Sequence, residues 1–153
     1  MHHEVELGVV IGKKCKNVNK ENALEYILGY CVCLDITARD IQDELKKNGY
    51  PWSIAKGFDT FAPISDVVLK EEVENPNNLD ICLKVNGKTK QKSNTKNMLF
   101  SVEQIIEFIS KIMTLQPGDL IMTGTPEGVD EIKKGDVLKA TLGDVCNLKV
   151  TVK

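Results

Sequence analysis

Residues 4–11 alternate between two sets of positions, which is typical of a β-strand because successive side chains point to opposite faces. One set is entirely apolar and predicts a face that packs on a core: Val5, Leu7, Val9 and Ile11. Glu4 and Glu6 belong to the other set and would lie roughly 6.6 Å apart on one face. Such a pair can bind one hard cation, since Mg²⁺ and Mn²⁺ prefer carboxylate oxygens. A half-exposed strand whose acids face water has the same pattern, so the pattern alone leaves both interpretations open.

Composition indicates an ordinary globular domain of 153 residues, of which 42% are hydrophobic and 27% charged. The formal net charge of −2 gives no support for binding nucleic acid or an anionic membrane surface. No apolar run approaches the roughly 20 residues that a membrane-spanning helix needs. The lysines between positions 88 and 96 alternate with Asn, Ser and Thr, which predicts a solvated loop rather than a binding surface.

The five cysteines predict a reduced, intracellular protein, because their number is odd and no Cys-x-x-Cys pair occurs. Cys31 and Cys33 lie in an apolar run and are expected to pack as small hydrophobic side chains. A zinc site built from them with His2 and His3 is disfavoured, since structural zinc usually requires a second closely spaced pair of ligands.

Strand signals outnumber helix signals and predict a strand-rich α+β domain with a mixed or antiparallel sheet. Asn86-Gly87 between two strand-like runs indicates a hairpin with a type I′ turn. The expected strands cover residues 4–11, 29–36, 79–85, 88–91, 120–122, 137–142 and 147–152.

Two capping patterns predict the starts of amphipathic helices. Thr37 with Asp40 would open a helix over residues 38–47 that Asn48-Gly49 ends. Ser101 with Gln104 would open a second helix that reaches about residue 115. A short helix is also expected over residues 23–28. The expected core-facing residues are Ala38, Ile41 and Leu45 in the first capped helix and Ile105, Phe108, Ile109 and Ile112 in the second.

Asp35 closes the second apolar strand and precedes the first capped helix. Side chains at strand ends can leave the core and reach a site, although an aspartate at such a junction also commonly forms a cap or a turn. Arg39 and Gln42 stand three apart on the following helix, away from its apolar positions. They could therefore reach one ligand together or simply face water.

Five segments, in this order along the chain, resemble those of the fumarylacetoacetate hydrolase family. The similarity runs from His2 to about Val150 and is nearest to the acylpyruvate hydrolase and oxaloacetate decarboxylase branch. The segments are Glu4-Val5-Glu6-Leu7; Leu34-Asp35-Ile36-Thr37-Ala38-Arg39-Asp40 with Gln42; Trp52 to Lys56-Gly57-Phe58; Val85-Asn86-Gly87; and Thr123-Gly124-Thr125-Pro126-Glu127-Gly128-Val129.

This resemblance implies a metal ion, normally Mg²⁺ with Mn²⁺ tolerated, that is held by Glu4, Glu6 and Asp35. It also implies a 2-oxo acid that chelates the metal, with Lys56 as the active-site lysine. Without the resemblance, Lys56 would be interpreted as a surface lysine and residues 123–128 as a plain turn. The implied substrate-binding residues are Arg39, Gln42, Gly124 and Thr125.

The implied activity is hydrolysis of a C–C bond in acylpyruvates, which are 1,3-diketo acids, to pyruvate and a carboxylic acid. Oxaloacetate decarboxylation is expected beside it, because both reactions expel the enolate of pyruvate, whose charge a divalent cation stabilises. Two alternatives stay open. One is an isomerase or decarboxylase of 2-hydroxy-diene-dioates from the same family, and the other is a catalytically impaired metal-binding protein.

Hydrolytic members of the family carry a His and a Glu on a lid helix upstream of the Glu-x-Glu strand, where they activate water. We therefore expect residues 1–153 to form one fumarylacetoacetase-like catalytic domain, a mixed β-roll with a few short helices, that lacks this N-terminal segment. His2 and His3 are expected to support the neighbouring metal ligands rather than replace the lid histidine. The resemblance also implies a homodimer in the mitochondria or the cytoplasm.

Overall fold

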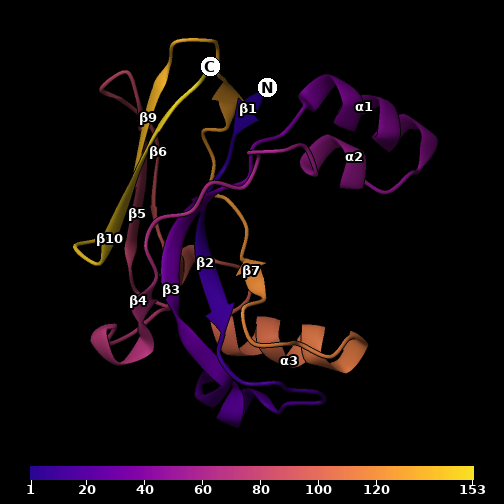
Figure 1. Cartoon of the computed structure of the whole chain (residues 1–153), viewed down its shortest axis with the longest axis vertical. Coiled ribbons are helices and arrows are strands. Elements are labelled where there is room, and N and C mark those ends of the chain that lie inside the picture. Colours follow the sequence, from indigo (N-terminus) through magenta and orange to yellow (C-terminus); the bar gives the residue numbers. More distant parts are fainter.

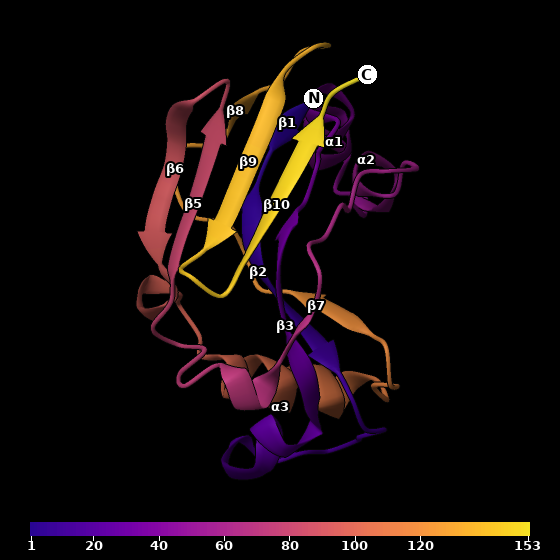
Figure 2. The same cartoon turned by 60° about the vertical axis from the view of Figure 1, so that its left-hand side comes forward.

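The computed structural model describes residues 1–153, and its core lies between two four-stranded antiparallel sheets (Figure 1). The first sheet has the strand order β4-β3-β2-β7, with bounds Val68–Leu69, Ile27–Leu34, Val5–Ile11 and Leu120–Met122. The second has the order β10-β9-β5-β6, with bounds Cys146–Thr151, Val137–Leu142, Asp80–Val85 and Lys88–Asn94, and faces the viewer in Figure 2. A separate short ladder joins β1 (His2–His3) to β8 (Asp130–Glu131). The predicted strand-rich α+β fold is confirmed.

Helices lie at the two ends of this sandwich rather than over its faces (Figures 1 and 2). Helices α1 and α2 follow β3 and together form an arm at one end of the molecule. Helix α3 packs at the opposite end, beside the 3₁₀ helix η1. No helix is both long and apolar enough to cross a membrane. The α-helices are α1 (Arg39–Asn48), α2 (Ser53–Lys56) and α3 (Val102–Ile112), and the 3₁₀ helices are η1 (Lys20–Tyr26), η2 (Lys70–Glu72) and η3 (Thr95–Asn97).

The apolar face expected from the first strand is confirmed, because its four side chains are at most 1% exposed and belong to the main hydrophobic core. Strand β2 pairs with β3 on one side and with β7 on the other, so it is the central strand that carries Glu6. The hairpin is also confirmed: Asn86 and Gly87 have φ angles of 50° and 81°, as a type I′ turn requires.

The lysine-rich segment between residues 88 and 96 is not a loop. It forms strand β6 and the beginning of η3, and β6 pairs with β5 along its whole length. The local hairpin turn brings this segment back along β5, so its backbone gains ladder partners while its lysines stay exposed. The expected short helix at residues 23–28 is instead the 3₁₀ helix η1.

The predicted capping box at Ser101 and Gln104 is present. The predicted inner face of α3 is right for Ile105 and Ile109, which pack against the core, and wrong for the other two residues. Phe108 and Ile112 are 66% and 61% exposed, whereas Val102, Ile106 and Ser110 are buried. The Ser110 hydroxyl accepts a hydrogen bond from the backbone N–H of Val18, at 3.0 Å. The turn before η1 needs this acceptor, so the helix face that carries Ser110 turns inward.

The expected capping box at Thr37 is wrong, although Gly49 ends α1 in a left-handed conformation as predicted. Helix α1 begins after Ala38, which makes no side-chain cap. The Thr37 hydroxyl donates to the carbonyl of Asp35 and accepts from Lys56 instead. Thr37 therefore belongs to the site at the end of β3.

Candidate metal and substrate site

Three carboxylates meet where β2 and β3 pair, at the foot of the α1–α2 arm. One oxygen from each of Glu4, Glu6 and Asp35 lies within 4.8 Å of the others. The backbone N–H of Asp35 donates to the carbonyl of Glu4 at 2.8 Å, which fixes the two chain segments side by side. Glu4 and Glu6 are only 9% and 4% exposed. The alternative in which these two acids face water is therefore wrong.

Two cations lie against this acid cluster. The Lys56 ammonium donates to Asp35 Oδ2 at 2.5 Å, to Glu4 Oε2 at 2.9 Å and to the hydroxyl of Thr37 at 2.7 Å. Arg39 Nη2 donates to Glu4 Oε1 at 2.6 Å. Lys56 is therefore not a free surface lysine. The two cations offset two of the three negative charges in the cluster.

Glu6 is the acid that has no cation of its own. Burial raises its pKa to about 7, and the charges of Asp35 and Glu4 add to the effect, although a hydrogen bond from the Gly124 N–H at 2.7 Å opposes it. At Glu4, burial acts in the same direction, but the bonds from Lys56 and Arg39 outweigh it and hold the pKa below its usual value. The cluster thus lacks one positive charge.

The donor set fits a hard divalent cation such as Mg²⁺ or Mn²⁺, because it consists of three carboxylates and the charge of one of them is uncompensated. Free carboxylate oxygens at this spacing can converge on one ion. No cysteine belongs to the group, and all five cysteines are free thiols. The expected packing of Cys31 and Cys33 as buried side chains is confirmed.

Metal binding should weaken as the pH falls below about 7, because the proton on Glu6 must leave before the carboxylate can coordinate an ion. The apparent Mn²⁺ affinity is expected to drop by about tenfold per pH unit in that range. Calorimetric titration between pH 5.5 and 8 in two buffers of different ionisation enthalpy measures both the affinity and the proton release. An affinity that is constant from pH 6 to pH 8, with no proton released, would contradict the assignment.

Two further residues predicted to bind substrate lie beside the cluster. Arg39 Nη1 donates to the side-chain oxygen of Gln42, one turn along α1. Gln42 is 2% exposed, so it does not face water, whereas Ile41 and Leu45 are only half-buried. The expected inner face of α1 is therefore wrong for Ile41 and Leu45, although Ala38 is buried as expected. The Arg39 guanidinium faces the acids because Glu4 is a charged partner, and the Gln42 side chain lies beside this guanidinium.

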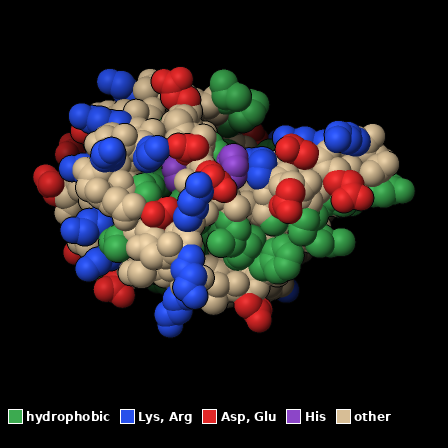
Figure 3. Space-filling model, turned by 90° about the horizontal axis from the view of Figure 1, so that it is seen from above, with side chains coloured by type: hydrophobic (Ala, Val, Ile, Leu, Met, Phe, Trp, Pro, Cys, Tyr) green, Lys and Arg blue, Asp and Glu red, His purple; other side chains and the backbone are tan.

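Seen from above, histidine, acidic and basic side chains gather beside the arm (Figure 3). Arg39 Nε donates to His2 Nδ1 at 3.4 Å. His3 is fully buried on the other side of the strand, where its Nδ1 contacts the Gln91 side-chain oxygen at 2.9 Å. Burial lowers the pKa of His3, so its imidazole is neutral. Both histidines thus contact neighbours of the acids, as expected.

The loop after β7 reaches the cluster from the side. Its Gly124 N–H binds Glu6, and the Thr125 hydroxyl donates to the carbonyl of Val5 at 2.9 Å. The same hydroxyl accepts from the amide of Gln91 at 2.8 Å. Sequence reasoning missed Gln91. Thr89 also lies between two lysines of β6, and Ser93 follows the next one, so nothing in the sequence of this strand distinguishes Gln91 from them.

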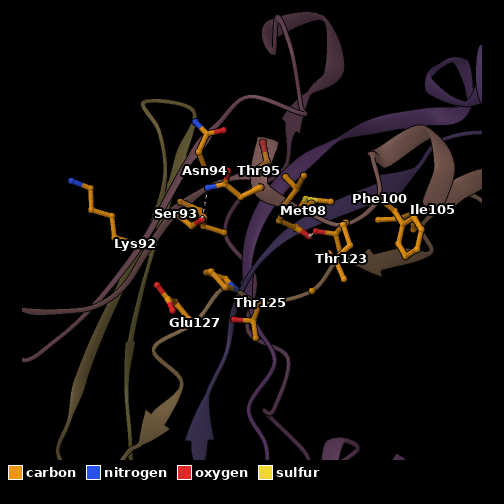
Figure 4. A pocket seen from close by; sticks show the side chains of 16 residues that line it. Lys92, Ser93, Asn94, Thr95, Met98, Phe100, Ile105, Thr123, Thr125 and Glu127 are labelled. Carbon is orange, nitrogen blue, oxygen red and sulfur yellow. Dashed lines mark hydrogen bonds between the residues drawn. The ribbon is translucent and has the colours of Figure 1, made fainter.

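A cavity with a volume of about 490 Å³ lies behind this loop, between it and β6 (Figure 4). Leu7 lines the cavity. Because neighbouring residues of a strand point to opposite faces, Leu7 points away from the side on which Glu6 lies. The cavity and the acid cluster are therefore on opposite sides of β2, and the loop with Gly124 borders both.

All 153 residues match the sequence model of the family described as fumarylacetoacetate (FAA) hydrolase, C-terminal. The chain belongs to the fumarylacetoacetate hydrolase family. Within this family, mitochondrial oxaloacetate tautomerase FAHD1 from Bos taurus is 49% identical over 152 residues, which are 99% of this chain and 69% of that protein. The uncharacterized protein PYRAB13970 from Pyrococcus abyssi is 55% identical over 138 residues, which are 90% of this chain and 61% of that protein.

Solved structures of family members have the same fold. Fumarylpyruvate hydrolase from Pseudomonas aeruginosa, in complex with Mn²⁺ and pyruvate, superposes with a TM-score of 0.95 at 37% identity, over 99% of this chain and 65% of that one. The 5-carboxymethyl-2-hydroxymuconate delta-isomerase from Mycobacterium smegmatis gives a TM-score of 0.90 at 41% identity, over 99% and 58%. The chain thus spans about two thirds of the length of several relatives and less of others. The predicted family is confirmed.

Proposed function

We propose that this chain carries the active site of a metal-dependent enzyme that acts on short 2-oxo acids through their enol or enolate form, with oxaloacetate tautomerisation as the leading reaction. The observation that carries the proposal is the buried cluster of Glu4, Glu6 and Asp35, in which one negative charge has no cation. The named relatives act on oxaloacetate, fumarylpyruvate and a hydroxymuconate. These substrates share a 2-oxo or 2-hydroxy acid group, whose enolate oxygen suits such a site.

A divalent ion held by the three acids would act as a Lewis acid toward the enolate oxygen of the substrate. The Arg39 guanidinium has five N–H groups, of which His2, Gln42 and Glu4 take three. The remaining two can bind a substrate carboxylate, and the Gln42 amide can add a third bond. The bonds to Asp35 and Glu4 outweigh the effect of burial and raise the pKa of Lys56, so its side chain is an ammonium ion. In the direction from enol to keto form, carbon 3 gains a proton and the enol oxygen loses one to solvent water. Lys56 is the group that can donate the proton to carbon 3, and its amine then regains a proton from water, so no proton is consumed overall.

Hydrolysis of acylpyruvates is the second candidate, favoured by the similarity to a fumarylpyruvate hydrolase whose structure contains Mn²⁺ and pyruvate. Hydrolysis also needs a base that activates water, whereas proton transfer and metal-assisted decarboxylation of oxaloacetate do not. Of the three acids in the cluster, Glu4 and Asp35 are paired with cations and are therefore weak candidates for this base. We therefore expect oxaloacetate to be converted faster than acetylpyruvate is hydrolysed.

Stopped-flow absorbance of enolic oxaloacetate, with the purified chain and Mg²⁺ or Mn²⁺, tests the leading reaction. The chain should accelerate ketonisation above the rate with metal alone, and a chelator should remove the acceleration. Acetylpyruvate cleavage and carbon dioxide release are followed in parallel. The proposal is wrong if metal-loaded protein leaves the rate of ketonisation at background, and the order of the candidates is reversed if acetylpyruvate reacts faster.

We also propose that the chain forms a homodimer, as the resemblance implies. In support, several large apolar side chains on and beside α3 lie outside the core, with Leu99, Phe108 and Ile112 from 61% to 93% exposed. Phe108 and Ile112 lie four residues apart and so on one face of α3, and a patch of exposed apolar side chains is typical of an interaction site. Sedimentation equilibrium should give twice the chain mass of 17.0 kDa, and a single species of the chain mass would contradict the proposal.

A further inference from the structure

Gln91 is a buried amide in a strand whose other side chains are mostly exposed. Its side chain is 1% exposed, and all four of its hydrogen-bonding positions are used. The oxygen accepts from the backbone N–H of Val5 at 3.1 Å and from His3 Nδ1 at 2.9 Å. The nitrogen donates to Thr125 Oγ1 at 2.8 Å and to the Pro126 carbonyl at 2.9 Å. The Val5 N–H can only donate and the Pro126 carbonyl can only accept, so these two partners fix the orientation of the amide.

These four partners lie next to the residues of the acid cluster. His3 and Val5 flank Glu4 in the sequence, so Gln91 holds the backbone on both sides of that acid. The other two partners directly follow Gly124, whose N–H binds Glu6. One side chain from the second sheet therefore connects the strand that carries the acids to the loop beside them.

We propose that Gln91 is a positioning residue that makes the Thr125 hydroxyl a hydrogen-bond donor to a carboxylate of the substrate. This inference rests on the proposed function, because it takes the substrate to be a 2-oxo acid. The hydroxyl has one hydrogen, and its oxygen already accepts a bond from the Gln91 amide. The hydrogen must therefore point away from Gln91, and in this structure it goes to the carbonyl of Val5.

A bound carboxylate is a stronger acceptor than this neutral carbonyl, because hydrogen bonds to ionised groups are roughly twice as strong as those between neutral groups. The hydroxyl can thus transfer its bond from Val5 to the substrate while its oxygen stays fixed by Gln91. His3 contributes by donating its Nδ1 proton to the amide oxygen, which holds the amide nitrogen toward Thr125.

Gln91→Glu tests the proposal because it keeps the shape and the accepting oxygen and removes both N–H donors. The new carboxylate would accept the hydrogen of Thr125 and so withdraw it from the substrate. Calorimetry measures the affinity of the chain for Mn²⁺ and then the affinity of the Mn²⁺-loaded chain for oxalate, which mimics the pyruvate enolate. Oxalate should bind about 10- to 100-fold more weakly, as expected for the loss of one charge-assisted bond. Any loss of Mn²⁺ affinity should be clearly smaller than the loss of oxalate affinity, because the two N–H donors contact Thr125 and Pro126 and none of the three acids.

Three further variants separate positioning from a general loss of structure. Gln91→Met is similar in volume and buries no charge, and it should also weaken oxalate while sparing Mn²⁺. Lys88→Met, an exposed change in the same strand, should alter neither affinity. In a Thr125→Val background, a change at Gln91 should have no additional effect on oxalate, since the hydroxyl is already absent.

The proposal is overturned if oxalate affinity is unchanged in both Gln91 variants, if Mn²⁺ and oxalate weaken in parallel, or if the effects at positions 91 and 125 are additive. Failure of the unmodified chain to bind oxalate in the presence of Mn²⁺ is a different result, because it rejects the proposed function itself. Circular dichroism at the temperature of the titration shows which variants are folded, and Gln91→Met decides the outcome if Gln91→Glu is not.

Discussion

Replacing Glu6 with glutamine should stabilise the metal-free protein and at the same time abolish its use of a divalent metal. In the folded chain the pKa of Glu6 is raised from 4.5 to about 7, so the folded state holds a proton that the unfolded state releases between these values. Stability from this group is therefore complete below pH 4.5 and is lost as the pH rises toward 7. Glutamine avoids the cost of the buried charge and can still accept the Gly124 bond.

Above pH 7 the gain for Glu6→Gln in the free energy of unfolding is expected to be on the order of 2–3 kcal/mol, and it should vanish toward pH 4.5. Mn²⁺ affinity should fall by roughly 100-fold or more, because one of three anionic ligands becomes neutral. Thermal denaturation from pH 4.5 to pH 8.5, with and without Mn²⁺, measures both effects. Glu44→Gln, an exposed change on α1, serves as the control. A variant that is less stable than the unmodified protein at pH 8, or that retains its Mn²⁺ affinity, would refute the role given to Glu6.

Replacing Lys56 with methionine should remove turnover while Mn²⁺ binding is retained or becomes tighter. The ammonium lies between Glu4 and Asp35, and its removal leaves two carboxylates that need a cation. Turnover needs the same ammonium as the proton donor to carbon 3, so kcat is expected to fall by about 10²- to 10⁴-fold. Loss of activity and gain of metal affinity in one variant distinguish this role from simple damage to the site.

The measurement for Lys56→Met combines the oxaloacetate assay with an Mn²⁺ titration at the same pH. Lys47→Met, on the exposed side of α1, should leave both values unchanged. Should the Lys56 variant lose Mn²⁺ affinity in proportion to its loss of kcat, the lysine would be a structural part of the cluster and would not be the proton donor.

Local patterns predicted the features that depend on neighbouring residues. The Asn86-Gly87 turn and the capping box at Ser101 are confirmed, because each is fixed by φ angles or by hydrogen bonds within four residues. The capping box proposed at Thr37 failed because the Thr37 hydroxyl accepts a hydrogen bond from Lys56, nineteen positions away, and none from the backbone of α1. The inner face of α3 was wrong for Phe108 and Ile112, and Ser110 is buried through its distant contact with Val18.

In the candidate site, too, local patterns predicted what depends on neighbouring residues and missed what depends on distant contacts. Alternation along the first strand indicated that Glu4 and Glu6 lie on one face, but only the family resemblance connected them with Asp35 and Lys56. No pattern indicated that the two glutamates are buried, since burial depends on the arm and on the loop after β7. Gln91 was missed because its contacts with the first strand span 86 and 88 residues. Such contacts are set by sheet packing, which sequence periodicity does not record.

A crystal structure of the chain grown with Mn²⁺ and oxalate tests the central claim most directly. The account predicts a single anomalous-scattering peak among Glu4, Glu6 and Asp35, with one oxygen from each carboxylate and oxygens of oxalate in contact with it. Well-ordered crystals with no peak at this position, or with the three carboxylates bonded only to Lys56, Arg39 and Gly124 as in the metal-free chain, would contradict it.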